Sequence, residues 1–310
     1  MRLPLTLPPP TRAIDLVTLG ENSLDLVAVV EPGVATASKQ PLRDFRLEPG
    51  GQMATAALGS ARLGLRTRYI GVFGTDEWST RARAPLDAAG VEVVATIRRG
   101  IPGRMAVILV DAAGERTVLE RRDLALVLAA VDVPDAAIVD ARILLVDATQ
   151  PAAALRALDR ARAAGVVSIS DVDQVTPDVD AILSRVDVAI VPEPFVATRT
   201  ATTDLETGLA RLTVHCRHAA VIVATRGAAG SLAWCNGQTI ATSGVPVDVV
   251  DTTGAGDAFR AGFATALIHL GSEAPLEDIL RFANVTGALN CRAVGAQAGL
   301  PTLAEVMARL

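Results

Sequence analysis

The sequence Asp248-Val-Val-Asp251-Thr-Thr253-Gly254-Ala255-Gly256-Asp257-Ala-Phe259 joins two segments of different pattern. Residues 245–250 are mostly apolar and β-branched, which is typical of a strand. Residues 258–270 repeat apolar side chains with the period of a helix. A strand, a glycine-rich turn and a helix start leave backbone N–H groups unpaired at the positive end of the helix dipole. The stretch therefore predicts an anion site that suits a phosphate.

Asp257 follows the two glycines and is expected in the first turn of that helix. A carboxylate is a poor ligand for a phosphate, but it suits a base that takes the proton of an attacking hydroxyl. We therefore expect phosphoryl transfer, with Asp257 as the base. The motif alone leaves one alternative open, a tight turn with an acidic helix start that serves stability only.

Composition and charge narrow the class of protein. The 310 residues can form one large α/β domain, and half of them are hydrophobic, as expected where parallel strands are buried between helices. The net charge of −5 argues against a nucleic-acid partner. No uncharged apolar run reaches the roughly 18 to 20 residues that span a bilayer, so we expect no membrane partner. Scattered Cys216, Cys235 and Cys291 predict free thiols in a reducing cytoplasm.

Two further segments of the N-terminal part have ligand-binding patterns. Residues 13–20 are typical of a buried strand, and Asp25 follows shortly after its end. Open α/β sheets bind ligands at the carboxyl ends of their strands, so Asp25 is placed to accept the hydroxyls of a polyol. A cap or turn carboxylate is the alternative. Gly50 and Gly51 open an Ala-rich helix, where a glycine pair lets the backbone approach a ligand closely.

The C-terminal half alternates strand and helix patterns from residue 143 onward, including a helix over 204–218. This alternation predicts a parallel sheet with right-handed crossovers. Thr225-Arg226-Gly227-Ala-Ala-Gly230 follows the strand pattern of residues 220–224. A hydroxyl and two glycines suit a nucleotide phosphate, although a glycine hairpin into the next strand needs no ligand.

These motifs together resemble the PfkB (ribokinase-like) carbohydrate kinase family. Residues 251–259 resemble its C-terminal signature, and Gly50-Gly51 resembles its N-terminal glycine signature, about 200 residues earlier. The resemblance covers residues 13–305 and implies a three-layer ribokinase-like α/β fold, with a mostly parallel central sheet flanked by helices. It makes residues 13–310 this domain and 1–12 a flexible Pro-rich tail. Segments 24–47 and 94–121 would form a small β-sheet lid, which could also join a homodimer.

The resemblance implies ATP-dependent phosphorylation of a hydroxyl on a sugar or sugar acid. Asp257 would be the base, and the N–H groups of Gly254, Ala255 and Gly256 would stabilise the transferred phosphoryl group. The implied substrate-binding residues are Ser23, Asp25, Gly50, Gly51, Thr55 and Arg104, and the implied ATP-binding residues are Thr225, Gly227, Gly230 and Asn284. The implied K⁺ site comprises Asp251, Thr253, Asn290, Ala293, Gly295 and Gly299.

Two positions depart from the family pattern. Where the family usually has Asn-x-x-Glu near its Mg²⁺, this chain has Glu193 and Val196. Oxygen contacts to Mg²⁺ through water would then come from Glu193, Asp171 or Asp173. Thr55 stands where an Asn is common. These departures keep open a catalytically impaired homologue that only binds a sugar or nucleotide. A nucleoside kinase is the other alternative, with Phe45 as the aromatic candidate, whereas the arginines in 116–122 favour an acidic or phosphorylated acceptor.

Overall fold

A computed structural model describes the chain from residue 1 to 310, apart from residues 31–32, 36, 112–115 and 121–122. Its centre is a nine-stranded sheet of order β13-β12-β11-β10-β9-β8-β1-β4-β5. The strands from β5 to β11 in this order pair in parallel, and the pairs β11–β12 and β12–β13 are antiparallel. The strands are β1 (Ile14–Leu19), β4 (Thr67–Phe73), β5 (Glu92–Ile97), β8 (Ala141–Asp147), β9 (Val167–Asp171), β10 (Val188–Pro192), β11 (Val221–Thr225), β12 (Ser231–Cys235) and β13 (Gln238–Thr242).

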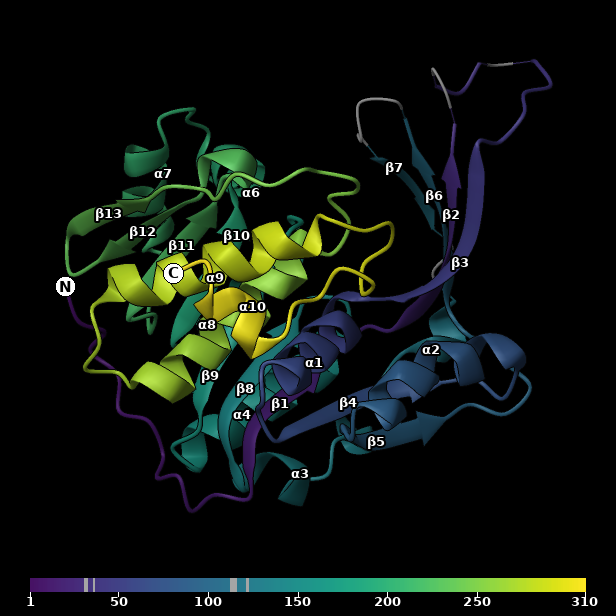
Figure 1. The fold of residues 1–310 in the computed structure, drawn as a ribbon. Coiled ribbons are helices and arrows are strands. Elements are labelled where there is room, and N and C mark those ends of the chain that lie inside the picture. Colours follow the sequence, from purple (N-terminus) through teal and green to yellow (C-terminus); the bar gives the residue numbers. More distant parts are fainter. Residues whose placement is uncertain (31–32, 36, 112–115, 121–122) are drawn as a thin grey trace.

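Helices cover both faces of this sheet (Figure 1). One face carries α1 (Gln52–Arg62), α2 (Glu77–Ala88), α8 (Ala255–Leu270), α9 (Leu276–Asn290) and α10 (Leu303–Met307). The other carries α3 (Ala136–Val139), α4 (Pro151–Ala163), α5 (Val179–Leu183), α6 (Glu193–Thr200) and α7 (Leu205–Leu212). Because side chains of a strand alternate between faces, Ile143 and Leu145 enter one core and Leu144 and Val146 the other. Because each central strand is buried on both faces, its sequence is a nearly continuous apolar run.

A second, four-stranded sheet projects from the body and is here called the lid (Figure 1). Its order is β3-β2-β6-β7, from β2 (Ser23–Val29), β3 (Asp44–Gly50), β6 (Met105–Val110) and β7 (Arg116–Glu120). The prediction that the lid includes the chain from residue 94 is wrong, because β5 pairs in parallel with β4 and extends the large sheet. Its alternating pattern is equally typical of an edge strand.

Two sequence predictions near the C-terminal half need correction. Residues 245–250 form no strand; they run as irregular chain after β13, with Val249 and Val250 exposed. Pro246 has no N–H to offer a sheet, and Val245 and Val247 line a cavity, which accounts for their apolar character. The helix predicted over 204–218 ends at Leu212, and turns follow it.

The first twelve residues lie against the body at several points. Leu3 is buried, the Met1 carbonyl accepts the N–H of Leu276, and the Arg142 guanidinium donates to the Pro8 carbonyl. Whether this segment is flexible stays a prediction. Cys216, Cys235 and Cys291 are buried free thiols. Over the described ranges, no helix combines the length and apolar character that a membrane crossing requires.

Candidate active site

The carboxyl ends of the parallel strands meet the start of α8, where residues 252–256 form a turn that we call the anion loop. Gly254 has a left-handed φ of 75°, and a Cβ there would lie 2.5 Å from the Ala296 carbonyl oxygen. The Ala255 N–H closes the turn on the Thr252 carbonyl at 3.2 Å. Within the described residues, the N–H groups of Gly254 and Gly256 have no hydrogen-bond acceptor. Two of the three predicted donors are therefore open to an anion.

Asp257 lies partly buried in the first turn of α8. Burial raises the pKa of Asp257 to about 6; Arg260 and Arg116 lower it, and Asp173 raises it. The Asp171 carboxyl lies within hydrogen-bonding reach of Asp257. A carboxyl with this pKa is ionised at neutral pH and accepts a proton more readily than an ordinary aspartate, so it is suited to act as a general base.

The predicted sugar residues come together where the lid joins the body. Asp25 on β2 is buried, and its Oδ1 has no hydrogen-bond partner among the residues described. Burial raises the pKa of Asp25 to about 6, while a hydrogen bond from Ser23 lowers it. A Cβ at Gly50 would lie 2.1 Å from Asp25 Oδ2. Gly51 has a φ of 89° and would bring a Cβ within 2.4 Å of Asn22 Cα, so both glycines are required by close packing.

Two other predicted substrate residues have protein partners. Thr55 is buried in α1 and accepts a hydrogen bond from Gln297 Nε2 at 3.4 Å, which ties α1 to the chain after α9. Arg104 precedes β6, and its carbonyl accepts the Leu24 N–H beside Asp25. Its guanidinium forms ion pairs with Glu21 and Glu120. Arg104 therefore lies at the acceptor side, but with its charge already compensated.

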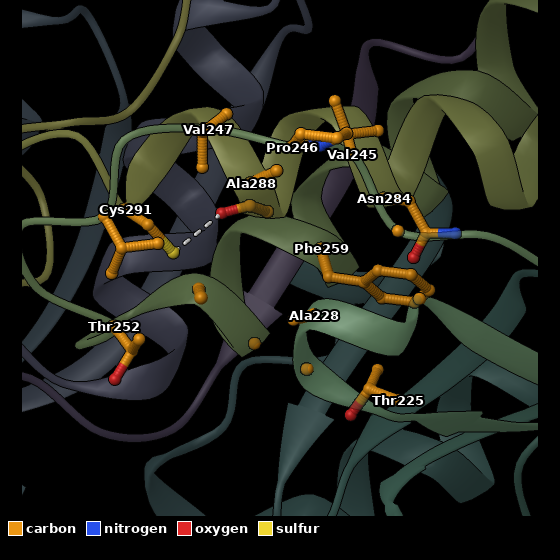
Figure 2. Close-up of a pocket in the computed structure, with 17 residues that line it drawn as sticks. Thr225, Ala228, Val245, Pro246, Val247, Thr252, Phe259, Asn284, Ala288 and Cys291 are labelled. Carbon is orange, nitrogen blue, oxygen red and sulfur yellow. Dashed lines mark hydrogen bonds between the residues drawn. The ribbon is translucent and has the colours of Figure 1, made fainter. Parts of the chain in front are cut away.

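A cavity of about 470 Å³ lies on the other side of the anion loop. Figure 2 shows Asn284 and Val245 at one end of it and Thr252 and Cys291 at the other. The four residues predicted to bind ATP all line it, namely Thr225, Gly227, Gly230 and Asn284. The anion loop supplies Ala255 and Gly256 to the same wall. A mostly apolar cavity that ends at open N–H groups has the shape and chemistry for a nucleotide.

Comparison with known proteins identifies the family of this chain. The model of the pfkB family carbohydrate kinases matches residues 13–303. The ribokinase of Bacillus subtilis is 28% identical over 312 residues, which cover 94% of this chain and 98% of the relative. The fructokinase of Klebsiella pneumoniae is 34% identical over 276 residues, which cover 82% and 89%. The structure of Arabidopsis thaliana ribokinase complexed with ribose and ATP has a TM-score of 0.80 at 23% identity, covering 96% of this chain and 98% of that chain.

The chain belongs to the PfkB family of carbohydrate kinases. It is a phosphotransferase and a sugar kinase with the ribokinase-like fold, which confirms the predicted fold class and family.

The loops predicted to hold K⁺ in this PfkB kinase are joined by the Asp251 carboxylate. Its Oδ1 accepts the N–H and the hydroxyl of Thr253, and its Oδ2 accepts the Gly295 N–H, all at 2.7–2.8 Å. Asn290 donates to the carbonyls of Thr253 and Ala296, while its buried Oδ1 has no partner in the described part of the chain. Gly299 packs against the Asn290 carbonyl, and Ala293 lies in the turn after α9. The orphan oxygen among carbonyls fits a monovalent cation.

The residues predicted on the magnesium side do not converge as those of the predicted K⁺ site do. Glu193 is exposed at the start of α6, and Val196 is fully buried against α7, where a Cβ at Gly208 would lie 2.6 Å from it. Val196 therefore packs in the core and offers no oxygen. Among the residues described, no group of three or more His, Cys, Asp or Glu side chains could hold a metal ion.

Two buried side chains near Asp257, Asp147 and Arg260, were not predicted from motifs. Asp171 was predicted on the magnesium side, and Arg116 on β7 is one of the arginines predicted to favour an acidic acceptor. Arg116 Nη1 donates to Thr252 Oγ1 at 3.3 Å, so the lid reaches the anion loop. Asp147 and Asp171 end β8 and β9, and a carboxylate at the end of a buried parallel strand is the signal that could have found Asp147 as well. Arg260 was not predicted because it lies within the otherwise apolar helical pattern of residues 258–270.

Proposed function

We propose that this kinase transfers the γ-phosphoryl group of ATP to a hydroxyl of a sugar or sugar acid, with Asp257 as the base. The observation that carries the proposal is the position of the anion loop between two sites. Gly256, one of the two residues with an open N–H group, lines the nucleotide cavity, and Asp257 follows directly in the same helix. A phosphate bound at the loop would therefore face an acceptor hydroxyl beside the carboxylate.

The proposed reaction balances with these groups alone. Asp257 takes the proton of the acceptor hydroxyl, and the oxygen forms a bond to the γ-phosphorus. The bond from the γ-phosphorus to the bridging oxygen breaks, and ADP leaves with the electron pair. The N–H groups of Gly254 and Gly256 stabilise the negative charge on the phosphoryl oxygens, which is the main work that a protein does in this reaction. Arg116 adds a cation from the lid side.

The acceptor is held by the side of the site that contains Asp25. Its ionised carboxylate can accept two sugar hydroxyls, and Ser23, Gly50 and Gly51 shape the space around it. The prediction of an acidic or phosphorylated acceptor rested on the arginines of residues 116–122. Arg116 contacts the anion loop instead, and Arg121 and Arg122 lie outside the described residues. The proposal therefore keeps neutral sugars and sugar acids together as acceptors.

Metal ions complete the proposed site. Mg²⁺ would arrive with ATP and neutralise its phosphates, and Glu193 is the side chain predicted on the magnesium side. K⁺ would lie near Asp251, Thr253, Asn290, Ala293, Gly295 and Gly299, where its charge would strengthen the anion loop. The lid edges offer a homodimer surface, since Phe45 on β3 and Val118 and Leu119 on β7 are exposed apolar side chains. Light scattering at working concentration tests the dimer, and a monomer would remove it.

The test of the function is ADP release with Mg²⁺ over a panel of ribose, fructose, 2-keto-3-deoxygluconate and adenosine. We expect turnover with at least one sugar, and Asp257→Asn should lose about 10²- to 10⁴-fold of it while nucleotide still binds in calorimetry. Unchanged turnover in that variant would refute the base.

Buried Val196, which replaces an oxygen ligand, favours a second candidate, a homologue that binds without catalysis. It predicts ligand binding with no ADP release under any metal. Turnover of adenosine alone would instead identify a nucleoside kinase.

A further inference from the structure

A buried ion pair lies directly behind the anion loop. Arg260 follows Asp257 by one turn of α8, and only 3% of its surface is exposed. Its Nε lies 2.8 Å from Asp171 Oδ1, and its Nη2 donates to the Ile190 carbonyl at 3.3 Å. A Cβ at Gly256 would lie 2.7 Å from Arg260 Nη1, so the glycine makes room for the guanidinium as well as for a phosphate. The cation therefore lies in contact with the loop that we expect to bind the phosphoryl group.

Asp171 joins three elements at this point. It ends β9 and is 1% exposed, and its Oδ1 also accepts a hydrogen bond from Gln52 Nε2 at 3.3 Å. Gln52 begins α1, directly after the glycine pair of the acceptor side. Asp171 Oδ2 has no partner in the part of the chain described, and the Asp257 carboxyl lies within hydrogen-bonding reach. Asp171 therefore connects the helix behind the acceptor to the helix that carries the base.

Without Arg260, the carboxyl groups near Asp257 would outnumber the arginines near it. Three carboxyl groups lie near it at and just after the ends of β8 and β9, namely Asp171 and Asp173, which act on Asp257, and Asp147, which acts on Asp171. Burial raises the pKa of Asp171, and the charge of Arg260 lowers it. Against them stand Arg260 from α8, Arg116 from the lid, and Arg104, which acts on Asp147. Of these three cations, Arg260 is the most buried and acts directly on both Asp171 and Asp257. A buried carboxylate that loses its cation takes up a proton, and a protonated Asp257 cannot be a base.

We propose that Asp171 and Arg260 form a positioning pair for Asp257, an inference that rests on the proposed role of Asp257 as base. Arg260 keeps the base ionised, and Asp171 holds the guanidinium so that it does not close onto Asp257 in a direct salt bridge. The base thus stays charged and free to accept the proton of the acceptor. Because Gln52 contacts Asp171, the pair also fixes the base relative to the glycine pair that borders the acceptor.

The pair predicts opposite effects of its two members on the pH dependence of kcat. In Arg260→Gln the acid limb should move to higher pH by about one unit, because the nearest cation is lost. In Asp171→Asn it should move to lower pH, and kcat should fall at least about tenfold, because the guanidinium turns to Asp257. In Arg260→Lys, the acid limb should lie between those of Arg260→Gln and wild type, because a cation is retained. The double variant Asp171→Asn/Arg260→Gln removes both charges, so its limb should return near that of wild type while kcat stays low.

Arg68→Gln is the matched control, because Arg68 is a buried arginine of β4 that pairs with Glu92 and Asp140 far from the loop. It should lower thermal stability and leave the pH limb unchanged. The proposal is overturned if the two single variants move the limb in the same direction or not at all. If a single variant does not fold, the double variant decides, since a limb far from wild type contradicts the pairing.

Wild-type turnover on the sugar panel and its loss in Asp257→Asn are measured first. Their absence refutes the proposed function, whereas their presence with unmoved limbs refutes only the positioning pair.

Discussion

The body and the lid of this kinase hold their functional groups in different ways. Around the anion loop, Gly254, Asp257 and Arg260 are fixed by packing between α8, α9 and the strand ends, and Arg260 is buried. In the lid, every residue of β7 is exposed, including Arg116, which reaches the loop through one hydrogen bond. A buried group keeps its geometry and acts through a low dielectric, whereas an exposed one is screened. Substitutions in the body should therefore have larger effects than substitutions in the lid.

The largest effect is expected from Gly254→Ala in the anion loop. A Cβ at this φ of 75° is strained and would lie 2.5 Å from the Ala296 carbonyl, so the loop must move. Because its N–H groups would no longer face the phosphate, kcat should fall about 100-fold or more. Gly271→Ala at the other end of α8 is the control, since its φ is 79° with no atom within 4 Å. It should cost about 1 kcal/mol of stability and no activity. Equal kcat in both variants would refute the role of the loop.

Gly50→Ala tests the joint between lid and body. Its Cβ would lie 2.1 Å from Asp25 Oδ2 and displace the carboxylate that we expect to hold the sugar. A displacement of this size should lower kcat/KM for the sugar about 100-fold. The KM for ATP should stay the same, because the nucleotide cavity lies on the other side of the anion loop. Gly64→Ala, at an open position after α1, should change neither constant. A rise in the KM for ATP would contradict the separation of the two sites.

The sequence could predict features that depend on local packing, but not those that depend on contacts between distant segments. The glycine signatures could be predicted because close packing demands glycine at Gly50, Gly51 and Gly254, and a local sequence pattern records that demand. Asp25 and Asp257 were predicted from their positions beside these signatures. Arg260 and Asp171 were not connected, because their contact joins segments nearly 90 residues apart. The strand predicted over residues 245–250 was wrong, since apolar residues that line a cavity have the same pattern as a buried strand. β5 was assigned to the lid because sheet membership depends on pairing partners that the sequence does not show.

A smaller effect is expected for Arg116→Gln in the lid. Wild-type kcat/KM should fall as the pH drops through about 6, because Asp257 must be ionised to act as base. The Arg116 charge lowers the pKa of Asp257, so its loss should move this limb upward by a few tenths of a pH unit. High salt should reduce the difference, because the side chain is exposed. Arg46→Gln removes another exposed lid arginine, paired with Asp44, and should leave the limb in place. A limb that moves as far as in Arg260→Gln would contradict the contrast between lid and body.

The smallest effect concerns stability, and it has the opposite sign to the effect on activity. Because the pKa of Asp25 is about 6 in the folded protein against an ordinary 3.8, its contribution to stability is present below pH 3.8 and is lost as the pH rises through 6. Asp25→Asn removes this loss, which is at most about 3 kcal/mol, and part of the gain is offset by the weaker hydrogen bond from Ser23. We therefore expect about 1 kcal/mol of stabilisation in urea at pH 8 and little at pH 5.

Asp44→Asn is the control, because the pKa of that exposed lid carboxyl is lowered by the Phe45 N–H and by Arg46, so neutralising it should not stabilise. A stabilisation of Asp25→Asn that is equal at both pH values would mean that burial of its charge is not the cause. A stabilised variant that no longer binds sugar would show that the acceptor side keeps a buried charge for binding, at a cost in stability that the exposed strand β7 does not carry.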